Sequence, residues 1–222
     1  MTHRPLAVRE RHDLVALSRE VGPDAPTLCD PWTSADLLAH LYVRENCPKA
    51  LPGIAGGPLA HLAEREMVRA LDRFGFSGLA DQVLAGPPAP MKFCDSQANT
   101  LEYFVHHEDL RRAQPGWEVR RLRAADRLEL ARRFGTFAAL LPSPTGGPVF
   151  LQSSDLAART TWLQGSARDL AAKRLKARLS VSPAPLVTRV RGPVAELIVW
   201  AFGRTGVARV DVDEVRDGGD HE

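Results

Sequence analysis

The chain has 222 residues, with 29 lysines and arginines against 27 aspartates and glutamates, and a formal net charge of +2. This length corresponds to one large domain or two small ones, and it is enough to bury a core without disulfide bonds. The longest apolar runs are far too short to span a bilayer, and the first residues lack the apolar stretch of a secretory signal. Balanced charge argues against general nucleic-acid binding. The three cysteines, which are Cys29, Cys47 and Cys94, are too widely spaced for a zinc knuckle or a disulfide framework. We therefore expect a soluble cytoplasmic protein that binds neither nucleic acid nor membrane.

The first part of the chain has the apolar spacing of helices. This spacing predicts helices over 7–21, 34–46, 59–85, 96–113 and 124–141, with a break in the third helix near Gly75. Thr33, followed three residues later by Asp36, predicts a capping box at the start of the second helix. The proline- and glycine-rich connections between the helices are short, so we expect an antiparallel bundle over residues 1–145.

The chain changes character after the proline-rich segment 142–148. Short β-rich runs predict strands over 149–152, 160–163, 177–181, 186–190 and 208–212, followed by an acidic tail exposed to solvent. Gly192 and Pro193 precede a helix that ends at Gly203. Strands grouped around one helix predict a second domain of the α+β class over residues 146–222, and hence an α+β chain of two domains.

Two side chains of the fourth predicted helix could carry chemistry. Glu102 and His106 are four residues apart, so they lie on one helical face, and that face points inward. A buried carboxylate and imidazole need partners. They could simply hydrogen-bond each other, act as a general acid/base pair, or bind a divalent metal together with His40 of the second helix. The spacing leaves all three interpretations open.

Two motifs resemble those of one known family. Residues 27–41 contain a Trp-Thr step followed by Asp-Leu-x-x-His-Leu, and Glu102 precedes a Val-His-x-x-Asp-Leu motif over 105–110. Both are similar to segments of the mycothiol-dependent maleylpyruvate isomerase-like proteins, which are DinB-like four-helix metal-binding bundles. The resemblance implies a metal site made of His40, Glu102 and His106, with Zn²⁺ as the metal. Three protein ligands would leave a position for water or a thiolate.

The C-terminal part resembles the α+β module of the same family, which is sterol-carrier-like. The pattern Gly-x-x-x-Glu-Leu-x-x-Trp-x-x-Gly-Arg occupies residues 192–204. The resemblance implies that Arg204 reaches the active site and binds an acidic substrate. The alternative is that Arg204 has no contact with substrate and that its positive charge only stabilises the negative end of the helix dipole. Many relatives have Gly-Trp where this chain has His107 and Glu108, so we expect a metal-binding branch distinct from the isomerase itself.

Five further residues leave alternatives open. Asp109 could accept a hydrogen bond from His106 or form a salt bridge with the arginines that follow it. His107 could replace His106 as a ligand, and His12 could join the metal shell. Cys29 and Cys47 flank the second predicted helix. Either thiol could bind metal or react, but a small buried apolar residue is the default interpretation of both.

The resemblance implies a metal-dependent transferase or isomerase. Such an enzyme would use mycothiol or another low-molecular-weight thiol on a small, electrophilic, acidic substrate, as a monomer or homodimer. The alternative function is a non-catalytic metal-binding protein whose C-terminal module binds a ligand or forms a dimer. A DinB-like protein that acts on nucleic acid is a third possibility, which the balanced charge weakens.

Overall fold

The structure is a computed structural model that describes residues 4–50, 53, 57–89, 95–156, 160–165 and 186–216. The chain divides into two compact units, residues 1–120 and 121–222. The boundary expected from the sequence lay at residue 145. The helix over 124–137 is therefore part of the second unit, where it packs against another helix of that unit.

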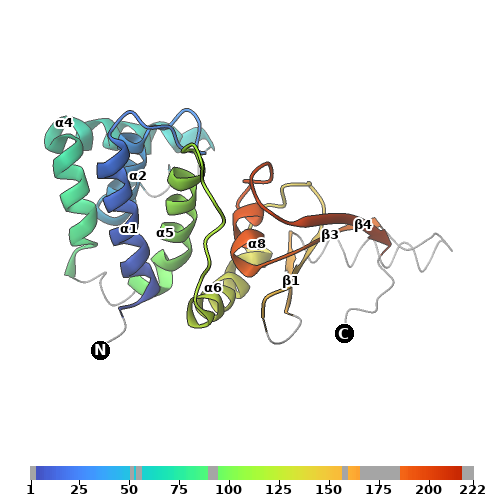
Figure 1. The fold of residues 1–222 in the computed structure, drawn as a ribbon. Coiled ribbons are helices and arrows are strands. Elements are labelled where there is room, and N and C mark those ends of the chain that lie inside the picture. Colours follow the sequence, from blue (N-terminus) through green and yellow to red (C-terminus); the bar gives the residue numbers. More distant parts are fainter. Residues whose placement is uncertain are drawn as a thin grey trace. The chain divides into compact units, whose positions relative to one another are not determined.

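In the part of the chain that the structure describes, the first unit has four long helices (Figure 1). They are α1 (Leu6–Val21), α2 (Ser34–Asn46), α4 (Ala60–Ala85) and α5 (Asp95–Arg112). The four helices predicted in this region are confirmed to within one residue or two at each end. Helix α1 packs against α5 and α4, and α2 packs against α4. All four helices contribute to one apolar core, which includes Leu14, Leu37, Leu41, Leu79 and Tyr103.

Two local features of these helices follow directly from the sequence. At the start of α2 the Asp36 carboxylate accepts the Thr33 backbone N–H at 2.9 Å, and the Thr33 hydroxyl accepts the Asp36 N–H at 3.4 Å. The predicted capping box is confirmed, and it fixes where the helix that holds His40 begins. Helix α4 is interrupted at Gly75, whose φ of 62° is a conformation that glycine adopts without steric cost. The predicted break is also confirmed.

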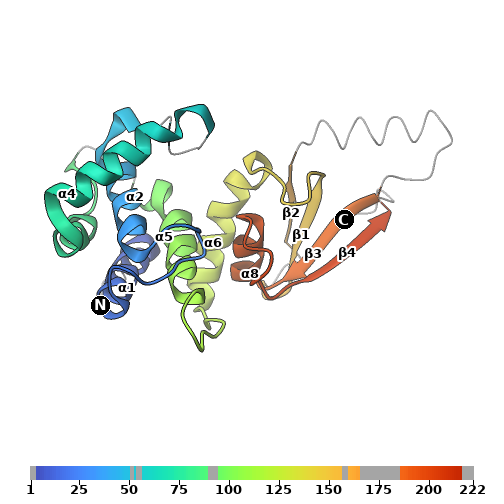
Figure 2. The same cartoon turned by 90° about the horizontal axis from the view of Figure 1, so that it is seen from above.

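The second unit combines helices with a four-stranded sheet (Figure 2). Its elements are α6 (Ala124–Phe137), β1 (Val149–Ser153), β2 (Thr161–Gln164), β3 (Leu186–Gly192), α8 (Val194–Ala201) and β4 (Asp211–Arg216). The strand order is β2-β1-β3-β4; β1 and β3 are parallel, and the outer pairs are antiparallel. Every residue of α8 is buried, and the helix packs against β1, β3 and α6. The prediction of a chain of mixed helices and strands is confirmed.

The last strand differs from the prediction. The predicted strand over 208–212 was wrong in its bounds, because the Arg204 carbonyl accepts the N–H groups of Val207 and Ala208 in a turn that delays the strand to residue 211. Asp211 and Asp213 therefore lie in an exposed edge strand and not in a tail. Charged side chains on an edge strand oppose pairing with other chains. The predicted strand over 177–181 lies outside the described residues, and none of the described helices combines the length and apolarity needed to cross a membrane.

Candidate metal centre

Helices α2 and α5 bring His40, Glu102 and His106 together. The Nε2 atoms of His40 and His106 each lie 3.3 Å from Glu102 Oε1, and the two imidazole rings meet edge to face with centroids 5.1 Å apart. One donor atom from each residue lies within 4.8 Å of the others. With metal–ligand bonds of about 2.0–2.2 Å, ligand atoms around a tetrahedral Zn²⁺ are about 3.3–3.6 Å apart. Two imidazoles and one carboxylate at this spacing form a donor set suited to zinc.

The charges of this cluster compensate one another. Burial alone would raise the pKa of Glu102, but hydrogen bonds from His106 and His40, with the positive charge of Arg44, bring it well below its usual range. Burial alone would lower the pKa of His106, but hydrogen bonds with Asp109, Cys29 and Glu102 raise it well above its usual range. Burial also lowers the pKa of His40. Glu102 is therefore ionised between a protonated His106 and a neutral His40, and a divalent cation would take the place of the proton on His106.

Asp109 lies directly behind His106. Its Oδ2 is 2.9 Å from His106 Nδ1, and its side chain is only 1% exposed. The hydrogen bond of Asp109 to His106 is confirmed, and Arg111 and Arg112 each pair with Glu108. A carboxylate that accepts from Nδ1 leaves Nε2 as the nitrogen that faces the other two donors.

Two further side chains of α2 and its preceding loop support the cluster. The Trp32 ring lies 4.8 Å from the His40 ring at an interplanar angle of 40°, so it packs against the imidazole. Arg44 places its Nε 3.2 Å from Glu102 Oε1 and also hydrogen-bonds the side-chain oxygen of Asn99. Sequence reasoning missed Arg44, although its spacing of four residues from His40 puts both on one helical face.

Of the two interpretations of Cys29, the structure favours a thiol with polar contacts over a small apolar residue. Its Sγ lies 3.1 Å from Asp109 Oδ2 and 3.9 Å from His106 Nδ1, so its contacts are polar. The available signal was its position just before Trp32, in the same segment that leads into the His40 helix. Cys47 follows the other end of α2, where burial and the nearby Glu66 raise the pKa of its thiol. Cys94 lies outside the described residues.

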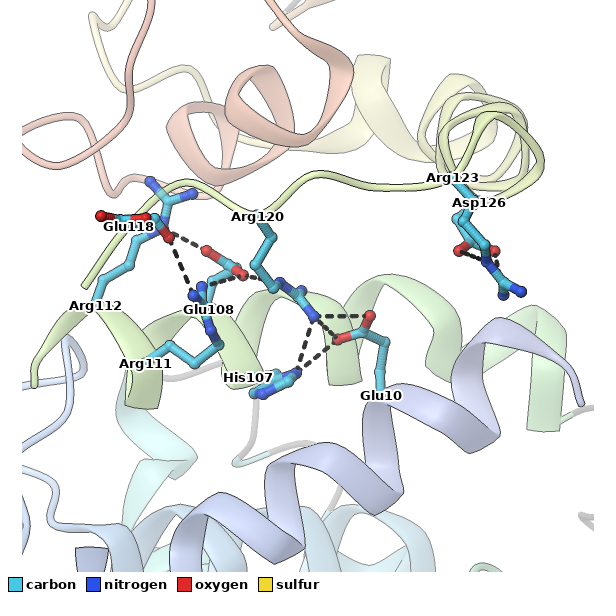
Figure 3. A network of polar contacts seen from close by, with 9 residues as sticks. All are labelled: Glu10, His107, Glu108, Arg111, Arg112, Glu118, Arg120, Arg123 and Asp126. Atoms are coloured by element: carbon cyan, nitrogen blue, oxygen red, sulfur yellow. Dashed lines mark hydrogen bonds and ion pairs between the residues drawn. The ribbon is translucent and has the colours of Figure 1, made fainter.

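His107 faces α1 and takes part in a separate charge network (Figure 3). Its Nδ1 is 2.8 Å from Glu10 Oε2. Arg120 reaches the same carboxylate at 3.0 Å and Glu108 Oε1 at 2.6 Å. Burial alone would raise the pKa of Glu108, but the three arginines around it lower this pKa. Within the described chain His107 does not enter the donor cluster of His106, so it is not placed to replace its neighbour.

The other two candidates lie away from the cluster or in the other unit. His12 is half-buried on α1 and contributes no atom to the described donor clusters. Arg204 belongs to the second unit, just after α8, where its backbone N–H donates to the Val199 carbonyl at 3.1 Å and its guanidinium to the Phe202 carbonyl.

Comparison with solved structures gives the fold a precedent. The chain is similar to a crystal structure described as mycothiol-dependent maleylpyruvate isomerase, with a TM-score of 0.53 and 14% sequence identity, over 94% of this chain and 90% of that one. It matches a histidine-to-alanine mutant of that enzyme with a TM-score of 0.54 and 15% identity over the same shares. The resemblance to mycothiol-dependent maleylpyruvate isomerase that the sequence implied is thus confirmed at the level of the fold. No family model matches the chain, and no curated protein sequence matches it.

Proposed function

We propose that this protein binds a divalent metal through His40, Glu102 and His106 and performs thiol-linked transferase or isomerase chemistry on a small electrophilic substrate. The observation that carries the proposal is the convergence of two imidazole nitrogens on one carboxylate oxygen, at 3.3 Å each, between α2 and α5. The mycothiol-dependent name of the enzyme with this fold supports a low-molecular-weight thiol, mycothiol or a related one, as the cofactor.

The donor set favours Zn²⁺, because imidazole and carboxylate both suit this ion and three protein ligands leave a position open. A metal bound there would lower the pKa of a thiol and hold it as the nucleophilic thiolate. The chain's own side chains would position the ligands. Asp109 would hold the His106 ring with Nε2 inward, Trp32 would hold the His40 ring, and Arg44 would offset part of the Glu102 charge.

The proposal extends to an acidic substrate and to Arg204. An arginine suits a carboxylate because its guanidinium can form two parallel hydrogen bonds. Arg204 closes the family-like pattern over 192–204, and this pattern supports a role in binding the substrate carboxylate. Replacing Arg204 with lysine keeps the charge but removes the paired geometry, so we expect weaker substrate binding with unchanged metal content.

The first experiment measures metal by elemental analysis of the purified full chain. We expect about one zinc per chain, loss of this zinc in His40→Ala and in His106→Ala, and its retention in His107→Ala. His107→Ala is the matched control, because it removes a neighbouring histidine of the same helix that binds Glu10 instead. Unchanged zinc in folded His106→Ala protein would contradict the site.

The second experiment separates an enzyme from a protein that only binds metal. Low-molecular-weight thiols are screened by thermal shift against the metal-loaded and the chelator-treated protein. A thiol that raises the melting temperature of only the metal-loaded form supports thiol-linked chemistry, because a ligand stabilises the state to which it binds. Metal-loaded protein that no thiol stabilises would favour the non-catalytic alternative.

A further inference from the structure

We propose that the chain has a second cation site, made of Cys29, His106 and Asp109, that binds a thiophilic ion such as Zn²⁺ on the opposite edge of the His106 ring. The inference goes beyond the proposed function, which uses only Nε2 of His106. The second site uses Nδ1, and the two nitrogens of one imidazole point in different directions. One histidine can therefore serve two neighbouring sites.

The three donor atoms have the spacing of ligands that share one ion. Cys29 Sγ and Asp109 Oδ2 are 3.1 Å apart, Asp109 Oδ2 and His106 Nδ1 are 2.9 Å apart, and Cys29 Sγ and His106 Nδ1 are 3.9 Å apart. With bonds of about 2.0–2.3 Å to nitrogen, oxygen and sulfur, tetrahedral Zn²⁺ holds such atoms about 3.3–3.6 Å apart. Movements of a few tenths of an ångström bring all three into one coordination sphere.

The loop that holds the sulfur is already fixed. The Leu28 N–H donates to the Asp109 carbonyl at 3.1 Å, which ties the loop to α5. The Cys29 N–H donates to the Thr27 hydroxyl at 3.1 Å, and this hydroxyl donates to the Trp32 carbonyl at 2.8 Å. Cys29 therefore approaches Asp109 from a constrained backbone, so little conformational entropy is lost when the thiol binds an ion.

Donor chemistry and burial decide which ion fits. A sulfur ligand favours Zn²⁺ and softer ions over Mg²⁺ and Ca²⁺, which take oxygen ligands. The Asp109 side chain is 1% exposed, whereas Cys29 is half-buried, so an ion would reach the site from the cysteine side. Binding displaces the thiol proton and the Nδ1 proton to the solvent. Because removing the second proton of a bridging imidazole costs additional free energy, the second ion should bind more weakly than the first.

Cobalt provides the test, because thiolate bound to Co²⁺ gives an intense near-ultraviolet charge-transfer band that nitrogen and oxygen ligands do not give. The full chain carries Cys47→Ser and Cys94→Ser so that Cys29 is the one remaining thiol. Chelator-treated protein is then titrated with Co²⁺. We expect two equivalents to bind, with the charge-transfer band absent during the first and developing fully during the second.

Two variants distinguish the sites. Adding Cys29→Ser should abolish the band and reduce binding from two equivalents to one. Adding His40→Ala should remove the first equivalent and keep the band. A band that develops fully with the first equivalent would overturn the proposal, because it would place Cys29 on the same ion as His40. If Co²⁺ binds to saturation and no charge-transfer band develops, the second site is also excluded. The first site is then tested separately, by whether one equivalent of Co²⁺ still binds and is lost in His40→Ala.

Discussion

The two sides of helix α5 use similar residues for different purposes. His106 faces α2, where it meets Glu102 and a second imidazole, with the nearest arginine bound to the carboxylate. His107 faces α1, where it meets Glu10 and the guanidinium of Arg120. Each imidazole thus has a carboxylate partner, and only the surroundings differ.

This difference shows what separates a candidate metal centre from a structural charge network. On the His107 side, the two buried carboxylates Glu10 and Glu108 are matched by Arg111, Arg112 and Arg120, so the acidic oxygens already have positively charged partners (Figure 3). On the other side, Glu102 lies between the neutral His40 and the protonated His106, with Arg44 as a further partner. A cluster that carries part of its positive charge as a removable proton can accept a divalent cation, whereas carboxylates already paired with several arginines are far less suited to one.

The largest effect should come from breaking the arginine-rich network. In Glu108→Gln the side chain of Arg112 loses this charged partner and Arg120 loses one of two, and Glu108 and Arg112 are both almost completely buried. Removing one partner of such a pair typically costs about 3–5 kcal/mol. We expect a loss of this size in the free energy of unfolding measured in urea, with the metal content of the folded protein unchanged. A loss below about 1 kcal/mol would mean that the network contributes little to stability.

The next effect should appear on the His106 side as lost metal affinity. Asp109→Asn keeps the size of the side chain but replaces the charged oxygen that accepts from His106 Nδ1 at 2.9 Å. Loss of such a supporting partner typically weakens metal binding about 10- to 100-fold. Competition with a chelating dye measures the affinity of the first equivalent.

Glu10→Gln is the matched control for Asp109→Asn. Glu10 contacts His107 at 2.8 Å, so this variant disturbs the neighbouring histidine without touching His106. It should lower stability and leave the metal affinity unchanged. Equal affinities in Asp109→Asn and Glu10→Gln would show that the contact behind His106 does not orient a ligand.

The third effect concerns helix α2, which carries His40. Thr33→Ala removes the hydroxyl that accepts the Asp36 N–H at the start of α2. Loss of such a cap costs about 1 kcal/mol. We expect this loss in urea unfolding, with one metal still bound per folded chain, since His40 lies two turns into a helix that also packs against α4. If Thr33→Ser has the stability of the unsubstituted protein, the lost hydroxyl cap is the cause of the destabilisation in Thr33→Ala. If Thr33→Ser is as unstable as Thr33→Ala, the cap is excluded as the cause.

Several features of the candidate metal centre around His106 could be predicted from the sequence, because they depend on residues close together in the chain. Glu102 and His106 share a face through helical spacing, and the cap at Thr33 defines the frame in which His40 lies. The contacts of Cys29 could not be predicted, since they join a loop to residues 77 and 80 positions away. The unit to which a helix belongs depends on the same kind of long-range contact. The helix over 124–137 has an ordinary amphipathic pattern, and its packing against α8 and the contact of Phe134 with Trp162 place it in the second unit.

The smallest effect tests whether burial, and not distance, sets the energy of these ion pairs. Arg19 and Asp81 approach to 2.5 Å, as closely as Arg112 and Glu108, but their side chains are 43% and 67% exposed. Water and salt screen the exposed pair, and ordering two long side chains costs entropy, so such pairs contribute about 0–1 kcal/mol. We expect Asp81→Asn to change the free energy of unfolding by less than about 0.5 kcal/mol. A loss comparable to that of Glu108→Gln would mean that contact distance alone determines the contribution, and the buried network would then have no special role.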